Sequence, residues 1–340
     1  MAFSAGISIV VAVALLAWFF IEKSQRKRRV VRGGIDRTVT LAHTEEFELY
    51  SNSFSHCSRK ARLVLAELGI QAKHNPIDLI ETGWYQTISP AYLKINPSGL
   101  VPTLVHNGHP VYESGDILDY AQSVAGPIAP QLVPDDPVLN RRMQEWLAFC
   151  SISSEDALAN MESQAGSCIP ALTLPMFVTS IQYIPLRRIL IGFLFHFDKK
   201  RPLIFTLSKL LGLRRMMSLK LVRDMKDAAS KHMTKHLDRL NTQLIEQGGD
   251  WVLGHDYSLA DVSIGCMLCR LDETGWLKYF SGTGSLGAVL SYYERIKSRP
   301  SWDKAITSCA HPIISKAEKD LSDAVSASPA MAELIYGKSI

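Results

Sequence analysis

The pattern of apolar and polar residues divides the chain into three stretches. An almost unbroken apolar run covers residues 3–21 and contains no charged side chain. From Phe47 onward, short apolar runs alternate with turn residues, and from Pro137 onward apolar residues recur at helical spacing. The pattern therefore predicts an apolar helix, then a compact α/β domain, then an all-α domain.

The α/β stretch, residues 46–128, has the order strand–helix–strand and then hairpin–helix. Gly69 ends the first helical stripe. Asn107-Gly108 separates two apolar runs and is the strongest short signal for a β-hairpin. This order predicts a mixed sheet. The predicted strands and helices cover 47–51, 59–68, 71–78, 101–105, 111–112 and 114–125.

The all-α domain is predicted over residues 136–320, with an insertion at about 164–222. This insertion holds nine basic residues, one acidic residue and two apolar runs. Both runs are too short to cross a bilayer. The pattern fits a helix on an anionic membrane surface, and it equally fits a helical insertion packed on its own protein. The other predicted helices cover 138–149, 221–247, 259–271 and 286–298.

The first apolar run is long enough for a membrane span, because about 20 apolar residues cross a bilayer as a helix. It has no preceding basic residue and no clear cleavage site, and a basic cluster follows it. We therefore expect an uncleaved transmembrane anchor over residues 1–22 and a basic, polar linker over 23–45. The positive-inside rule then predicts a single-pass membrane protein whose folded domains are cytoplasmic.

The composition gives a sizeable core, since 47% of the residues are apolar, and only a mild formal net charge of +4. No nucleic-acid partner is expected. The six cysteines are scattered, which indicates a reducing compartment rather than a disulfide framework. Cys266 and Cys269 form a CxxC inside an apolar helix, where two core-facing residues are expected. No second pair has zinc-ligand spacing, so no metal is predicted.

The candidate chemistry begins at SHCSR, where a strand, a polar turn and a helix follow one another. A helix N-terminus stabilises an anion or a thiolate. Ser55 and Cys57 lie at this point. Taken alone, Ser55 is a good helix cap and Cys57 a good small buried residue, so these five residues leave their roles open.

Two further segments point to a peptide ligand. Pro102 at the start of a strand is a candidate for a cis bond, and Val101 before it would present its backbone to the ligand. Glu113-Ser114 opens the next helix, whose N-terminus is an anion site. A ligand with a carboxylate, an amine and a thiol would match this set.

These segments resemble the soluble-type glutathione S-transferases. NPSGLVPTL and YESGDILDY are similar to segments of their thioredoxin-like, glutathione-binding half. In the helical half, the S-x-x-D of Ser258–Asp261 and YYERIKSRPSW match the family's capping box and terminal helix. The likeness is to zeta-, theta- and omega-like classes, to the dehalogenase-like group and to the ganglioside-induced differentiation-associated group. It implies glutathione as co-substrate.

The resemblance implies roles for six residues and leaves three functions open. In a membrane-anchored transferase, the Ser55 hydroxyl would hold the glutathione thiolate for attack on a small apolar electrophile beside Trp146 and Phe149. In a reductase or dehalogenase, Cys57 would form a mixed disulfide with glutathione. The third option is a non-catalytic, membrane-associated binding module. A homodimer is common in the family. The implied glutathione-binding residues are Val101, Pro102, Glu113 and Ser114.

Overall fold

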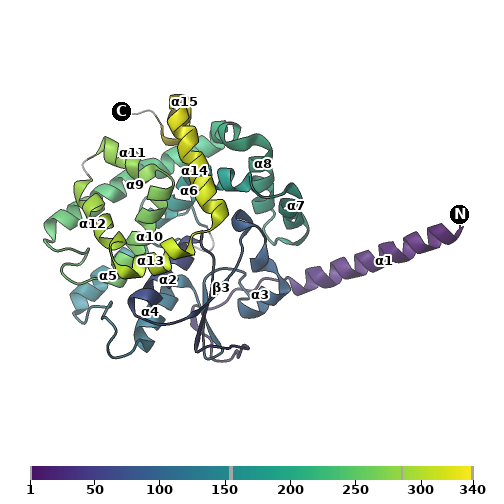
Figure 1. The fold of residues 1–340 in the computed structure, drawn as a ribbon, viewed down its shortest axis with the longest axis horizontal. Helices are drawn as coiled ribbons and strands as arrows, with labels where there is room; N and C mark the ends of the chain where they lie inside the picture. The colour runs from purple at the N-terminus through teal and green to yellow at the C-terminus, as the bar shows by residue number, and fades with distance from the viewer. Residues whose placement is uncertain (1, 153–155, 285, 338–340) are drawn as a thin grey trace.

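The computed structural model describes residues 2–152, 156–284 and 286–337. Helix α1 (Ala2–Gln25) projects from the rest of the molecule as a single rod, and its C-terminal end meets the body between α3 and α7 (Figure 1). The rest of the chain forms a small sheet with its helices and a larger helical part (Figure 1).

The predicted transmembrane helix is wrong. Within the described residues, no helix is both long and apolar enough to cross a membrane. The predicted single-pass membrane protein with cytoplasmic domains is therefore wrong as well.

The sheet has five strands in the order β1-β5-β4-β2-β3. Strands β2 and β3 pair in parallel, and the other neighbours are antiparallel. Asn107 and Gly108 both have positive φ, 48° and 82°, as the two-residue turn of a tight hairpin requires. The strands are β1 (Gly34–Ile35), β2 (Phe47–Ser51), β3 (Lys73–Pro76), β4 (Thr103–His106) and β5 (His109–Tyr112).

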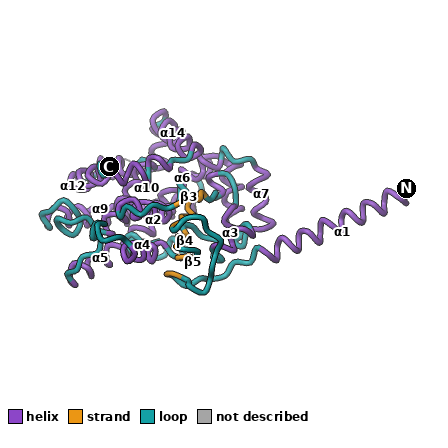
Figure 2. Tube along the Cα trace, turned by 60° about the horizontal axis from the view of Figure 1, so that its bottom comes forward, coloured by secondary structure: helices purple, strands orange, loops and turns teal. Residues whose placement is uncertain are grey.

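The polar linker is more ordered than its sequence pattern predicts. Gly34 pairs with Tyr112, so β1 adds an edge strand to the sheet. The backbone N–H of Arg29 also donates to the carbonyl of Pro97 at 2.8 Å. The loop that leaves α1 therefore follows the sheet before it enters β2 (Figure 2).

Helix α2 (His56–Glu67) is the centre of the fold, because it packs against both parts of the chain. Its apolar side joins a core formed with the sheet, α4 (Ser114–Val124) and the helical part. Helix α3 (Pro90–Ile95) and the short turns η1 (Ile80–Thr82) and η2 (Gln86–Ile88) complete the α/β part. A thioredoxin-like arrangement followed by a helical domain is therefore confirmed.

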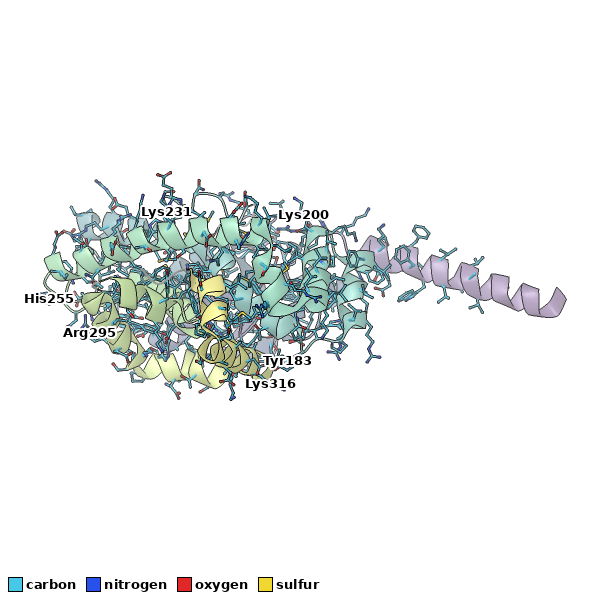
Figure 3. All side chains as sticks on the ribbon, turned by 90° about the horizontal axis from the view of Figure 1, so that it is seen from above. Tyr183, Lys200, Lys231, His255, Arg295 and Lys316 are labelled. Carbon is cyan, nitrogen blue, oxygen red and sulfur yellow. The ribbon has the colours of Figure 1, made fainter. Side chains whose placement is uncertain are left out.

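The helical part surrounds α10, most of whose side chains are buried. Ser258 and Asp261 form the predicted capping box at its start. Figure 3 places His255 and Arg295 at the end of this part farthest from α1. Its helices are α5 (Pro137–Phe149), α9 (Lys220–Glu246), α10 (Leu259–Glu273), α11 (Trp276–Thr283), α12 (Gly287–Lys297), α13 (Pro300–Ala305), α14 (Pro312–Ala327) and α15 (Pro329–Tyr336), with the turns η3 (Ala165–Cys168) and η4 (Thr307–Cys309).

The insertion forms α6 (Ile169–Ile181), α7 (Leu186–Phe195) and α8 (Lys200–Ser218). Its inner side packs on η1 and η2, where Ile189 and Phe205 join the buried cluster around Tyr85. Arg201 forms an ion pair with the buried Glu81 at 3.1 Å, and Arg188 donates to the carbonyl of Gly83 at 3.1 Å. The insertion thus packs on its own protein, which is one of the two interpretations that the sequence left open.

Candidate active site

Strand pairing brings the predicted site residues to one end of the sheet. Because β4 is antiparallel to both β2 and β5, the end of β2, the start of β4 and the end of β5 meet there. Helix α2 begins shortly after β2, and α4 begins directly after β5. We call the residues gathered here the sheet-end site: Ser55, Cys57, Val101, Pro102, Glu113 and Ser114.

Ser55 is the N-cap of α2. Its side-chain oxygen accepts a hydrogen bond from the backbone N–H of Ser58 at 3.2 Å, so the predicted cap is confirmed. The turn is fixed by Asn52, whose Oδ1 accepts from the backbone N–H groups of Phe54 and Ser55 at 2.9 and 3.1 Å. A hydroxyl that accepts one bond keeps its proton for donation, so Ser55 is both a cap and an available donor.

Cys57 follows in the first turn of α2, where its free thiol is partly exposed. Its neighbour His56 is buried instead. Burial first, and then the positive charges of Lys60 and Arg270, hold the pKa of His56 well below its usual value. The imidazole is therefore neutral at physiological pH and faces the protein interior, which leaves Ser55 and Cys57 as the reactive candidates of this turn.

The loop before β4 is fixed by hydrogen bonds from the side chains of Tyr92 and Asn96. The Val101–Pro102 peptide bond is cis, as predicted. The Tyr92 hydroxyl donates to the carbonyl of Leu100 at 2.6 Å, and the Asn96 amide donates to the same oxygen at 3.0 Å. The backbone of Val101 is therefore presented from a fixed loop.

Glu113 occupies an uncommon backbone conformation at the start of α4, with φ 63° and ψ 133°. Non-glycine residues held at positive φ are costly, and they cluster at functional sites. Burial first, and then the charge of Asp116, raise the pKa of Glu113, whereas Arg28 acts in the opposite direction. Ser114 follows as the first residue of α4, where unpaired backbone N–H groups favour an anion.

Two other predictions about side chains have different outcomes. Trp146 and Phe149 do not offer an open wall for an electrophile, because both rings are buried and the guanidinium of Arg239 lies over both. Cys266 and Cys269 are buried in α10 as expected, and burial raises the pKa of each thiol to about 12. Both are therefore core residues.

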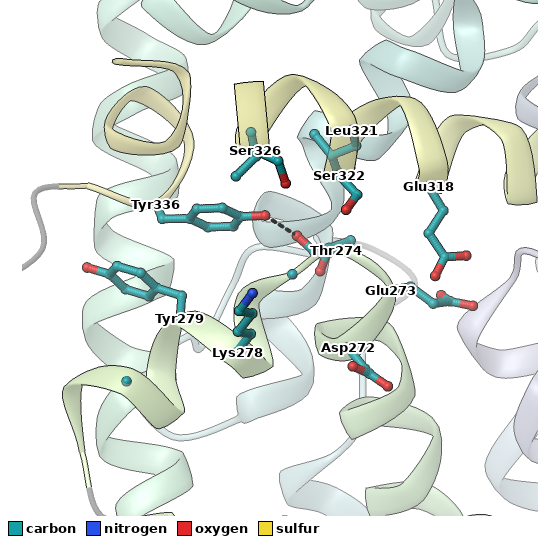
Figure 4. A pocket seen from close by; sticks show the side chains of 13 residues that line it. Asp272, Glu273, Thr274, Lys278, Tyr279, Glu318, Leu321, Ser322, Ser326 and Tyr336 are labelled. Carbon is teal, nitrogen blue, oxygen red and sulfur yellow. Dashed lines mark hydrogen bonds between the residues drawn. The ribbon is translucent and has the colours of Figure 1, made fainter. Parts of the chain in front are cut away.

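A separate pocket of about 500 Å³ lies at the far end of α10, against α14 and α15 (Figure 4). The Tyr336 hydroxyl closes one side by donating to the carbonyl of Thr274 at 2.9 Å. Glu273 lines the pocket, and its carboxylate is already paired with Arg59 of α2 at 2.6 Å. None of the sheet-end residues lines this pocket.

Comparisons with protein families agree with this geometry. Residues 54–124 match the family described as "Glutathione S-transferase, N-terminal domain". Residues 218–305 match "Glutathione S-transferase, C-terminal domain". The two matches leave out most of the insertion, and the first includes Ser55, Val101 and Glu113.

Relatives at the sequence level belong to several branches. Human ganglioside-induced differentiation-associated protein 1-like 1 is 25% identical over 280 residues, 77% of this chain and 74% of that protein. The tetrachloro-p-hydroquinone reductive dehalogenase of Sphingobium chlorophenolicum is 24% identical over 266 residues, 76% and 95% of the two chains. Rat maleylacetoacetate isomerase is 39% identical over 89 residues, 26% of this chain and 40% of that protein.

Solved structures show the same fold. The beta-etherase LigF from Sphingobium sp. strain SYK-6 superposes with a TM-score of 0.59 at 20% identity, over 78% of this chain and all of that one. A delta-class glutathione transferase of Nilaparvata lugens gives 0.53 at 20% identity, over 81% and 99% of the two chains. The chain thus matches both the N-terminal and the C-terminal domain of the glutathione S-transferases, as the resemblance predicted. At the level of the family, a transferase with glutathione as co-substrate is confirmed.

Sequence reasoning missed two features around the site. Arg28 lies in the linker, far from Glu113 along the chain, yet its charge acts on that carboxyl. The buried pair of Arg59 with Glu273 joins residues more than 200 positions apart. Neither contact leaves a local pattern, although a cluster of three cations in α2 hints that this helix contacts more than the sheet.

Proposed function

We propose that the chain is a glutathione transferase in which the sheet-end site binds glutathione and activates its thiol. The observation that carries the proposal is the position of Ser55, whose capped helix start shares one end of the sheet with Val101 and Glu113. Backbone at Val101 would pair with the peptide part of glutathione. Glu113 would accept its amine, and the N-terminus of α4 at Ser114 would receive its carboxylate.

The proposed reaction is attack of the glutathione thiolate on an apolar electrophile. The Ser55 hydroxyl would donate a hydrogen bond to the sulfur, and the N-terminus of α2 would add its positive dipole end. Both interactions favour the thiolate over the thiol, so more of the bound glutathione is nucleophilic at neutral pH. His56 is not part of this step, because its ring is buried.

Calorimetric titration of the full chain with glutathione, followed by rates with a panel of apolar electrophiles, tests this function. We expect saturable binding and conjugation, with Ser55→Ala lowering the rate more than the affinity. Absence of glutathione binding would contradict the proposal and favour a binding module without catalysis. Size-exclusion chromatography of the same sample tests the predicted homodimer.

A second candidate function uses Cys57. Its thiol is partly exposed in the same helical turn as Ser55, and the chain resembles a reductive dehalogenase along most of that enzyme's length. Attack of the Cys57 thiolate on a glutathionyl conjugate would form a Cys57–glutathione disulfide and release the reduced product. A second glutathione would then restore the thiol and leave as glutathione disulfide.

Mass spectrometry of the protein under turnover separates the two candidates. A Cys57–glutathione disulfide that disappears in Cys57→Ser, together with loss of reduction but not of conjugation, is the result expected for the second function. Full activity of Cys57→Ser in every assay would remove this thiol from the mechanism.

A further inference from the structure

A cavity of about 640 Å³ lies where the end of α1 meets the loop between α7 and α8. One wall comes from residues 20–28 and the other from residues 194–199. The two walls are joined by aromatic contacts, since the ring of Phe195 lies 6.3 Å from Trp18 and 5.7 Å from Phe19. The volume is in the range of small-molecule pockets, about 300–1,000 Å³.

The charged residues that line this cavity are cationic. No carboxylate is among the described residues that line it. Glu22, outside the lining, pairs with Arg26 at 2.7 Å, and the other four cations form no ion pair with a described residue. Like charges at close range repel one another, so an anion placed among them would be stabilised. The cationic lining residues are Lys23, Arg26, Lys27, Arg28 and Lys199.

Lys199 faces a cation of the opposite wall. Its ammonium group donates to the carbonyl of Phe193 at 2.8 Å, which turns it toward the end of α7. Burial first, and then the charge of Lys23 from the opposite wall, lower the pKa of Lys199. The two walls therefore bring ammonium groups of separate segments close enough to act on each other.

Aromatic rings hold the two guanidinium groups in place. Arg26 lies 4.6 Å from the ring centre of Phe195, and Arg28 lies 4.8 Å from that of Phe197. The N–H groups of Arg26 already donate to Glu22 and to the carbonyl of Ile88. The guanidinium edge that can bind a planar or tetrahedral oxyanion in a bidentate way is therefore that of Arg28. The rings themselves give the ligand an apolar surface.

We propose that this cavity binds a small amphipathic anion, an alkyl or aryl group that ends in a phosphate. The cations hold the phosphate, and Phe195 and Phe197 pack on the apolar group. A free phosphate monoester and the headgroup of an anionic lipid share this chemistry, and the experiment below separates them.

The cavity adjoins the sheet-end site but shares none of its six residues. Two residues of the cavity link it to that site. The ring of Phe197 lies 3.7 Å from the position that a Cβ on Gly99 would take, two residues before Val101, and the charge of Arg28 lowers the pKa of Glu113. The variants that test the proposal therefore leave both residues unchanged, so that its failure is distinguishable from a failure of glutathione binding.

Titration calorimetry of the full chain with octyl phosphate tests the proposal. We expect saturable binding that weakens at least tenfold in the double variant Lys27→Glu/Lys199→Glu and less in Lys27→Gln/Lys199→Gln. The matched control is Lys231→Glu/Lys235→Glu, which makes the same charge change on exposed positions of α9. Lys231 lies farther from α1 than Lys200 does (Figure 3), and we expect this control to bind like the unchanged chain.

Three further titrations complete the test. Octanol and inorganic phosphate should each bind more weakly than octyl phosphate, because each lacks one half of the recognised chemistry. Equal loss in the Lys27/Lys199 and Lys231/Lys235 variants would overturn the proposal, as would octanol that binds as tightly as octyl phosphate. Binding to anionic phosphatidylserine vesicles without binding to octyl phosphate would also overturn it, because the site would then recognise a lipid surface.

Discussion

The first and second turns of α2 differ in what their polar side chains do. Ser55 and Cys57 are only partly buried at the sheet end, where their side chains are available to a ligand. One turn later the cations are buried and bound to other elements: Arg59 to Glu273, and Lys60 to the carbonyl of Cys150 at 3.0 Å. We call Ser55 and Cys57 the tip of this helix, and Arg59 and Lys60 its body. The tip is available for chemistry, and the body is fixed to the helical domain.

This difference explains how a reactive group is held in position. The bidentate pair of Arg59 with Glu273, at 2.6 and 2.8 Å, fixes the direction of α2 against α10. Burial opposes the charge on Glu273, but Arg59 and Arg270 hold the pKa of this carboxyl below its usual value. The precision of the tip therefore depends on contacts that take no part in the chemistry.

The largest expected effect comes from breaking the body of the helix. Arg59→Met leaves the partly buried Glu273 carboxylate without its main partner, so we expect the free energy of unfolding to fall by about 1–3 kcal/mol. Urea denaturation followed by circular dichroism measures this change.

Two controls sharpen that measurement. Lys319→Met breaks an exposed pair with Asp323 and should cost less than about 1 kcal/mol. The double variant Arg59→Met/Glu273→Gln should recover part of the loss, because it removes the carboxylate that has lost Arg59. Only part returns, since Arg270 also pairs with Glu273 at 3.6 Å. An Arg59→Met protein as stable as Lys319→Met would contradict the assigned role of the body.

The next effect is at the tip, where capping and chemistry are separable. Ser55 and Ser328 both cap a helix through their side chains, with 3.2 and 3.3 Å to the capped N–H. Replacing either by Ala should lower stability by about 1 kcal/mol. Only Ser55→Ala should also lower kcat/KM for conjugation, by about a hundredfold. Similar rates in the two variants would leave Ser55 as a cap alone.

The smallest effect concerns the charge state of Glu113. Because its pKa is raised, we expect the affinity for the amine of S-methylglutathione to fall on acidification at a pH above the usual carboxyl range. Asp116→Asn removes a charge that raises this pKa and should move the fall to lower pH. Arg28→Gln removes a charge that lowers it and should move the fall to higher pH. Calorimetry across pH measures both, and unshifted curves would show that Glu113 does not bind the amine.

Local patterns were enough to predict the parts of the fold that depend on neighbouring residues. The hairpin at Asn107-Gly108, the cap at Ser55 and the cis bond before Pro102 follow from turn and cap chemistry within a few positions. Strand and helix boundaries moved by only a few residues for the same reason.

Contacts between distant segments were not predictable in this way. A strand of two residues, Gly34–Ile35, forms only because β5 lies beside it. The aromatic pair Trp146 and Phe149 has the same spacing whether it faces a pocket or the core, and here it faces the core. The N-terminal apolar run met the hydropathy expectation for a span and still did not form one in the described part of the chain.

The central claim is that Ser55 favours the thiolate of bound glutathione, and the pKa of that thiol tests it most directly. Ultraviolet absorbance of the thiolate, followed across pH with saturating glutathione, gives this pKa for each variant. We predict a thiol pKa below that of free glutathione in the unchanged chain and in Cys57→Ala, and a clear rise toward the free value in Ser55→Ala. A thiol pKa that is the same in Ser55→Ala and in the unchanged chain would contradict the account.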